Sequence, residues 1–190
     1  MNLPNFLSSI RILIALIAPF YLINGTLWVR VIAGVFCAIA VATDWFDGWY
    51  ARKYNEVTKL GKILDPIADK ILILISFSVF VYLGELSIWW VIPVFIREIV
   101  ITIYRFIFLS KNIVVAAAKS GKIKTVMQMS TLGIIYILFM AKNHYKEYFS
   151  EHYQHVLWIA LVFTLYLTVK SGIIFFKNNW DLIKRFHQLA

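Results

Sequence analysis

Cysteine and charged residues are both scarce in this chain of 190 residues. The single cysteine, Cys37, can form no intrachain disulfide and no thiolate metal cluster, so sulfur chemistry gives no account of the fold. Only 15% of the residues are charged, which is too few to give a domain of this length the polar shell of a soluble protein. The composition therefore excludes an ordinary water-soluble domain.

Apolar residues take the place of the missing charge, at 61% of the chain with a mean hydropathy of +0.76. A bilayer core about 30 Å thick is crossed by about 20 helical residues, and six segments have roughly this length. We therefore predict an all-α integral membrane protein with six transmembrane helices. The predicted spans are Phe6 to Ile23, Leu27 to Tyr50, Ile63 to Leu83, Ile88 to Leu109, Ile123 to Ala141 and Val156 to Phe176.

The basic residues gather in alternate connections. Lys and Arg are frequent from Arg52 to Lys62 and from Lys111 to Lys124, and they are absent from Asn24 to Thr26 and from Gly84 to Ser87. By the positive-inside rule the basic connections are cytoplasmic, which predicts a multi-pass protein of the cell membrane with both termini inside. One connection does not follow this rule. The segment from Lys142 to Glu151 carries two lysines, although it is predicted to lie on the outer side.

The net charge of +9 has a simple interpretation in this arrangement. Positive residues at the ends of apolar segments would meet anionic membrane lipids and phosphorylated substrates. No nucleic-acid-binding module is visible, so no nucleic-acid partner is expected. Because the chain contains no internal repeat and no low-complexity linker, we predict a single domain over residues 1–190.

Four aspartates interrupt the apolar pattern, where each ionised group costs several kcal/mol unless it is compensated. They are Asp44, Asp47, Asp65 and Asp69. The first two are three residues apart and the last two are four apart, so each pair would lie on one face of a helix. A short connection joins the two helices, which predicts a polar cavity near the cytoplasmic surface. Any one of these aspartates could instead pair with a neighbouring Lys or Arg.

Proline at position 66 leaves the start of the third span open. Asp65 could be the N-cap with Pro66 at the first helical position, or the helix could begin near Leu60 and bend at the proline. The ligand chemistry is the same in both cases. Oxygen donors without His or Cys select hard cations, so Mg²⁺ or Mn²⁺ is expected, and two ions would balance four carboxylates.

The spacing of these residues carries a family resemblance. The pattern Asp44-x2-Asp47-Gly48-x2-Ala51-Arg52-x8-Gly61-x3-Asp65-x3-Asp69 resembles, at every fixed position, the signature of the CDP-alcohol phosphotransferases. Members of that family are membrane proteins with six spans. The resemblance implies transfer of a substituted phosphoryl group from a CDP-linked donor to an alcohol, with release of CMP, and it implies a homodimer.

The resemblance also implies roles for single residues. The four aspartates would be the metal ligands, and Asp69 would also take the proton of the attacking hydroxyl. Two residues, Gly48 and Ala51, would leave room for the cytidine. The remaining donor contacts would come from Arg52, Thr58 and Gly61.

Basic residues in other predicted helices indicate what kind of acceptor the protein would bind. Arg97 and Arg105 are eight residues apart on one face of the predicted fourth span, and Arg11 is the only charged residue of the first. Lys119 and Lys122 stand at the start of the fifth span. Together they would form a basic pocket suited to an acceptor that carries phosphate. Two plainer interpretations stay open, in which Arg97 pairs with Glu98 and lysines such as Lys124 and Lys111 are only membrane anchors.

Longer segments support a particular acceptor. The stretches Asn2 to Asn5 and Lys119 to Thr125 resemble bacterial members of the family that use CDP-diacylglycerol as donor and glycerol 3-phosphate as acceptor. The alternatives are a sister enzyme that uses inositol phosphate, serine or phosphatidylglycerol, and an aspartate-rich polyprenyl transferase. A cation transporter or channel is a more remote alternative, because its acidic site would be expected near the membrane midplane.

Overall fold

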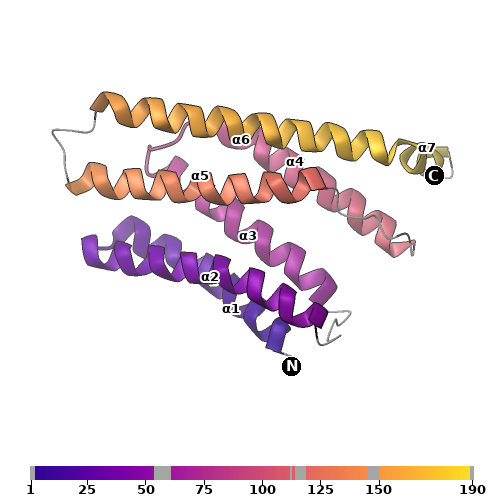
Figure 1. The fold of residues 1–190 in the computed structure, drawn as a ribbon, viewed down its shortest axis with the longest axis horizontal. Coiled ribbons are helices and arrows are strands. Elements are labelled where there is room, and N and C mark those ends of the chain that lie inside the picture. The colour runs from indigo at the N-terminus through magenta and orange to yellow at the C-terminus, as the bar shows by residue number, and fades with distance from the viewer. Residues whose placement is uncertain (1–2, 54–60, 112, 114–118, 145–149, 189–190) are drawn as a thin grey trace. The chain divides into compact units, whose positions relative to one another are not determined.

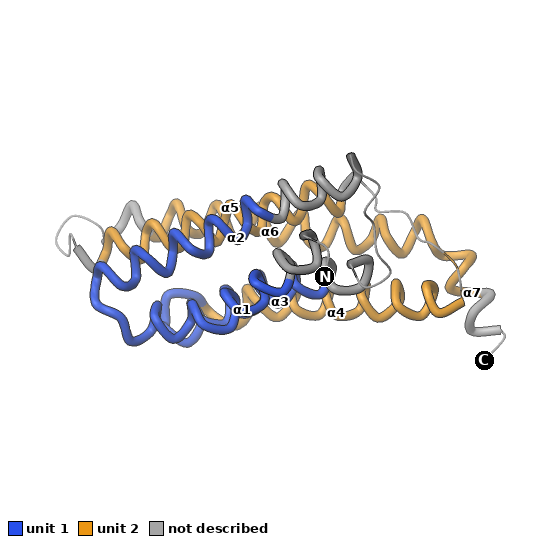
Figure 2. Tube along the Cα trace, turned by 90° about the horizontal axis from the view of Figure 1, so that it is seen from below, with its two compact units in different colours: residues 1–86 blue, residues 87–190 orange. Residues whose placement is uncertain are grey.

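In the computed structural model the chain is helical throughout its described part (Figure 1). The structure describes residues 3–53, 61–111, 113, 119–144 and 150–188, and the side chains of residues 3–8, 44–53, 61–66, 69, 119–120, 143–144, 150–153 and 185–188 lie outside this description. The chain divides into two compact units, residues 1–86 and residues 87–190 (Figure 2). The first unit contains α1 (Leu3–Asn24), α2 (Leu27–Lys53) and α3 (Gly61–Tyr82). The second contains α4 (Ile88–Ser110), α5 (Lys119–His144), α6 (Ser150–Asn178) and α7 (Trp180–Gln188).

Each of the six predicted spans coincides with one of the helices α1 to α6, so their helical structure is confirmed. Two helices of the described residues are long and apolar enough to cross a membrane, Gly121–Lys142 in α5 and Gln154–Asn178 in α6. Shorter apolar segments occur in α1, α2 and α3, and α4 carries three charged residues along its length. The all-helical membrane protein is supported, whereas the count of six spans stays a prediction.

Many large apolar side chains face outward, while several polar or charged side chains are buried. Trp89 is 77% exposed and Ile159 is 71% exposed, while Arg11 and Gln128 are buried at 1% and 0%. In a water-soluble protein large apolar residues are mostly inside and charged residues are almost never fully buried. Lipid tails are as apolar as these exposed side chains, so the distribution is the one expected of helices in a membrane.

The first unit is organised around α1, which packs against both α2 and α3. Small residues line these contacts and are almost fully buried. They are Ala15 and Ala18 of α1, Ala33 and Ala40 of α2, and Ala68 of α3. Because alanine has a minimal side chain, helix backbones can approach closely at these positions. The helix α1 is thus the common support of the two helices that carry the aspartate motif.

The start of α3 decides between the two sequence interpretations of Pro66. The helix begins at Gly61, four residues before Asp65, so Asp65 is not its N-cap and Pro66 lies within the helix. The end of α3 is a tight turn at Gly84, which has a positive φ of 74°. The amide of Glu85 donates to the carbonyl of Phe80 over 3.0 Å, and that of Leu86 donates to the same carbonyl over 3.2 Å. A glycine in this left-handed conformation commonly ends a helix.

In the second unit α6 packs against both α4 and α5. Aromatic pairs mark the contact with α4, where the rings of Trp90 and Trp158 meet edge to face at 5.0 Å and those of Tyr104 and Phe176 at 5.6 Å. The short helix α7 was not predicted from the sequence. Its Ile183 is buried at 6% exposure, and the ammonium of Lys184 lies 5.5 Å from the Trp180 ring centroid.

Gly84 offers a direct test of the turn. A Cβ added there would meet no atom within 4 Å, so Gly84→Ala should act through the backbone alone. We expect the free energy of unfolding to fall by about 1 kcal/mol, because an L-residue is disfavoured at positive φ. The measurement is the thermal unfolding midpoint of the purified protein in detergent.

The matched control is Gly133→Ala in the middle of α5, where a Cβ also meets no atom within 4 Å and no positive φ occurs. This variant should be neutral or slightly stabilising, because alanine is the better helix former. An equal midpoint for Gly84→Ala and the wild type would contradict the role given to Gly84.

Candidate active site

The predicted metal ligands lie on α2 and α3 in the first unit. Asp44 and Asp47 fall in the last turns of α2, about one helical turn apart, and Asp65 and Asp69 have a similar separation in the first turns of α3. The helix α2 also carries Gly48, Ala51 and Arg52, and α3 begins at Gly61. The side chains of these residues lie outside the described set, and Thr58 falls in the segment 54–60, which is also outside it.

The metal site itself is untested. Among the side chains that the structure describes, no three His, Cys, Asp or Glu residues lie together in a way that could hold a metal ion. The four aspartates do not belong to that set of side chains. What the backbone establishes is that both predicted pairs belong to continuous helices of one compact unit.

Arg11 ties α1 to the helix that carries the first two aspartates. Its side chain is 1% exposed, and its Nε donates to the backbone carbonyl of Ala40 over 3.2 Å. The hydroxyl of Thr43 donates to the same carbonyl over 2.9 Å. Since Ala40 precedes Asp44 by about one helical turn, Arg11 sits beside the start of the motif. Whether it contacts an acceptor stays a prediction.

A buried charged cluster lies in the second unit around Glu98 of α4. The carboxylate is 3% exposed, and it accepts hydrogen bonds from Arg97 Nη1 at 3.0 Å to Oε1 and 3.2 Å to Oε2. Lys124 of α5 also donates to Oε1, and its side chain is only 3% exposed. The interpretation of Lys124 as a membrane anchor is therefore wrong. The lysine points inward because Glu98 offers it a compensating charge.

Arg105 belongs to the same cluster. It lies two helical turns after Arg97 on α4 and interacts electrostatically with Arg97 and Glu98. Its guanidinium carbon lies 5.9 Å from the centroid of the Phe175 ring of α6. The Nε atoms of Arg97 and Arg105 are buried and have no hydrogen-bond partner among the described residues. Each of these two donors would gain a hydrogen bond if a ligand oxygen reached it.

Two further basic residues, Lys122 and Lys119, were predicted to contact the acceptor. Lys122 is exposed on α5, two residues before the buried Lys124. Lys119 is the first residue of α5, and its side chain is outside the described set. The structure therefore brings Arg97 and Arg105 together and adds Lys124 to them, while it leaves the contribution of Lys119 untested.

Sequence reasoning missed a seam of buried polar residues between α5 and α6. Gln128 Nε2 donates to Thr168 Oγ1 over 3.3 Å, and the hydroxyls of Thr131 and Thr164 are 2.6 Å apart. All four side chains are at most 2% exposed. The sequence contains a signal for this seam, because the polar residues at positions 124, 128 and 131 follow helical spacing within an apolar segment. Such residues hold helices together where water is absent.

Three basic side chains belong to this part of the second unit. Arg97 and Lys124 donate to the Glu98 carboxylate, and Arg105 lies two helical turns after Arg97 on α4. Arginine presents planar pairs of donors and lysine a point charge, and both suit phosphate oxygens. The cluster is chemically able to hold a phosphate group.

Comparison with known proteins identifies the class. The chain belongs to the CDP-alcohol phosphatidyltransferase family, which it matches over residues 1–166. This confirms the resemblance found in the aspartate motif, and it makes the protein a transferase of that kind. The match extends across the boundary between the two compact units.

Individual relatives share one name. The chain is 35% identical to the CDP-diacylglycerol–glycerol-3-phosphate 3-phosphatidyltransferase of Bacillus subtilis, with 96% of this chain and 97% of that protein covered. It is 33% identical to the protein of the same name from Rickettsia felis, with 93% and 94% covered. It is 36% identical to the protein of the same name from Salmonella choleraesuis, with 70% of this chain and 75% of that protein covered.

The pairing of Glu98 with Lys124 can be tested by a double-mutant cycle. Glu98→Leu leaves Lys124 buried without its described partner, so we expect a loss of about 3 kcal/mol or more in the free energy of unfolding. Adding Lys124→Met should restore part of the loss, because both charges are then absent. The readout is the thermal unfolding midpoint in detergent.

Lys122→Met is the matched control, since Lys122 lies on the same helix but is exposed. It should leave the midpoint nearly unchanged. Strictly additive effects of Glu98→Leu and Lys124→Met would show that the two side chains are not coupled.

Proposed function

We propose that this protein transfers the phosphatidyl group of CDP-diacylglycerol to glycerol 3-phosphate, forming phosphatidylglycerophosphate and CMP. The supporting observation is the agreement between the relatives' shared name and the cationic cluster around Glu98. A neutral acceptor such as serine would offer no negative charge to the basic side chains of Arg97, Arg105 and Lys124. An acceptor with its own phosphate would offer one, and phosphate oxygens suit such donors.

The aspartates are suited to hold divalent ions. Asp44, Asp47, Asp65 and Asp69 offer only carboxylate oxygens, which fit hard cations, and the family generally uses divalent metal ions. We infer Mg²⁺ or Mn²⁺, with two ions per site. Ions bound there would offset the negative charge of the donor pyrophosphate and of the departing CMP. Asp69 would accept the proton of the attacking hydroxyl.

The donor would be held by the rest of the motif. Gly48 and Ala51 have minimal side chains, one helical turn along α2 from the aspartates, and would leave space for the cytidine. Arg52 would bind the donor phosphates, with Thr58 and Gly61 completing the donor site. The diacyl chains would stay in the lipid.

The acceptor would be held by the basic residues. We assign its phosphate to Arg97, Arg105 and Lys124, with Arg11, Lys119 and Lys122 as further contacts. The unpartnered Nε atoms of Arg97 and Arg105 support this assignment. The aspartates and Arg11 belong to the first compact unit, and the other basic residues belong to the second.

The same proposal fixes the membrane arrangement. One domain over residues 1–190 would cross the cell membrane six times, with both termini and the active site on the cytoplasmic side. The support is the alternation of basic and non-basic connections. The protein would act as a homodimer, as the family resemblance implies.

An acceptor screen tests the reaction. The purified protein in mixed micelles, given labelled CDP-diacylglycerol and Mg²⁺, should release CMP and form labelled phosphatidylglycerophosphate only with glycerol 3-phosphate. EDTA should stop the reaction and excess Mg²⁺ or Mn²⁺ should restore it. Turnover with inositol phosphate, serine or phosphatidylglycerol alone would assign a sister activity. Turnover that persists in EDTA would remove the metal role.

Arg105 is the sharpest test of the acceptor site. Arg105→Gln should raise the KM for glycerol 3-phosphate about tenfold or more, because a charge-assisted contact is lost, and should change the KM for CDP-diacylglycerol little. Lys111→Gln is the control, since Lys111 is exposed at the C-terminal cap of the same helix. An unchanged KM for glycerol 3-phosphate in Arg105→Gln would reject the assignment.

A further inference from the structure

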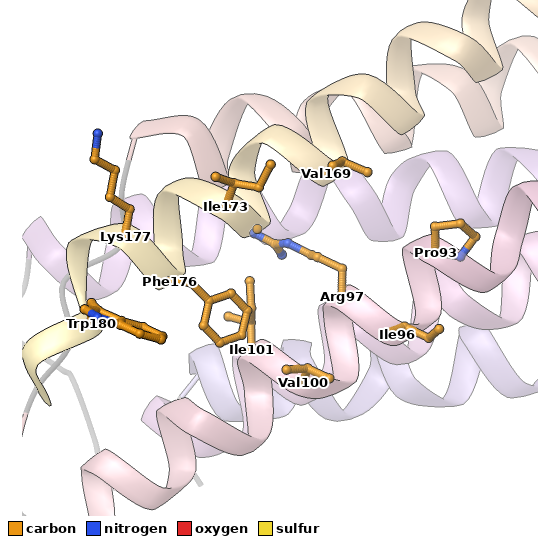
Figure 3. A pocket seen from close by; sticks show the side chains of 11 residues that line it. Pro93, Ile96, Arg97, Val100, Ile101, Val169, Ile173, Phe176, Lys177 and Trp180 are labelled. Atoms are coloured by element: carbon orange, nitrogen blue, oxygen red, sulfur yellow. The ribbon is translucent and has the colours of Figure 1, made fainter. Parts of the chain in front are cut away.

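A groove lies between α4 and α6, with a volume of about 870 Å³ (Figure 3). Its walls are apolar, and some of them face outward, since Ile96 and Ile173 are 57% and 62% exposed. The other apolar lining includes Val100, Val169 and Phe176. A space of this size is within the range of pockets that hold a small organic ligand or part of a lipid.

Two cations border this apolar groove, and none of its lining residues is acidic. Arg97 crosses toward α6 at Gly172, where a Cβ would lie 3.5 Å from Arg97 Cγ (Figure 3). Its Nη1 is bonded to Glu98, whereas its Nε is buried without a partner among the described residues. Lys177 is exposed in the last turn of α6. The groove therefore combines an apolar surface with a positive potential.

The groove has a polar end and an apolar end. Lys177 and Trp180 both come from the junction of α6 and α7, with the ammonium of Lys177 pointing away from the Trp180 ring, and Val169 and Pro93 lie at the opposite end (Figure 3). Lysine and tryptophan are favoured at the membrane–water interface, where an apolar stem or ring and a polar group are both accommodated. The polar end is thus placed where lipid head groups would lie.

We propose that this groove binds an anionic phospholipid from the surrounding bilayer. The lipid phosphate lies at Lys177 and Trp180, and one acyl chain runs past Ile173 and Val169 toward Pro93. Arg97 adds to the attraction from the groove wall. A zwitterionic lipid is bound less well, because its own positive group opposes this potential. The site goes beyond the proposed reaction, and the two share only Arg97, which borders the groove and is also assigned to the acceptor phosphate.

Photocrosslinking tests the proposal directly. Phosphatidylglycerol with a diazirine in its acyl chain is added at low fraction to phosphatidylcholine vesicles that contain the full-length protein. After irradiation, crosslinked peptides are mapped by mass spectrometry. We expect crosslinks on α6 between Val169 and Phe176 and on α4 near Ile96, and we expect excess unlabelled phosphatidylglycerol to compete better than phosphatidylcholine.

Matched variants give the controls. Lys177→Gln should reduce crosslinking at Ile173 about fivefold, the usual effect of one interfacial cation on anionic lipid binding. Lys170→Gln is the comparison, because Lys170 is exposed on the same helix two turns earlier, lies over Tyr166 and does not line the groove. It should leave the signal unchanged.

Three results would overturn the proposal. Equal competition by the two unlabelled lipids would show that the groove does not select charge. Equal crosslinking of Lys177→Gln and the wild type would remove Lys177 from the site. An absence of lipid crosslinks on α6, as expected if a second copy of the chain covers the groove, would exclude a lipid occupant.

Discussion

Compensation of buried charge is the constraint that decides how the second unit is built. Glu98 lies within an apolar helix and is 3% exposed, so it must be paired or neutral. Arg97 pairs with it from the adjacent position, and Lys124 reaches it from α5. This contact joins α4 to α5 near the start of α5. Further along α5, the hydrogen bonds of Gln128 and Thr131 with Thr168 and Thr164 join it to α6. Helices that lack a hydrophobic driving force in lipid are held in register by such polar contacts.

In the first unit, small residues hold the helices together. Alanines at 15, 18, 33, 40 and 68 are buried, and they allow α1 to pack closely on α2 and α3. Arg11 adds one buried hydrogen bond to the carbonyl of Ala40. The helices that carry the aspartate motif, α2 and α3, are thus both supported by α1, which contains none of the motif.

Local features of the sequence predicted most of the fold. Apolar segments of about 20 residues marked α1 to α6, because the bilayer sets their length. The helix α7 escaped notice, since its nine residues are too few to cross a membrane and its apolar positions form only one face. The aspartate motif was readable because its spacing is short and helical. The pair between Glu98 and Lys124 was not, since 26 residues separate the partners and a lysine near a helix start usually reaches outward.

The cations of the second unit differ in how a bilayer would reach them. Lys177 lies in the last turn of α6 beside the start of α7 at Trp180, where a lipid head group can reach a charge without leaving the interface. Lys124 is buried and Arg105 is partly enclosed by Phe175, so an anion that reaches them must leave the lipid surface and enter the protein. A small, water-soluble phosphate compound can do this, whereas a diacyl lipid would have to withdraw its chains from the hydrocarbon. The enclosure of Lys124 and Arg105 therefore favours binding of a soluble acceptor, and the exposure of Lys177 favours binding of a lipid.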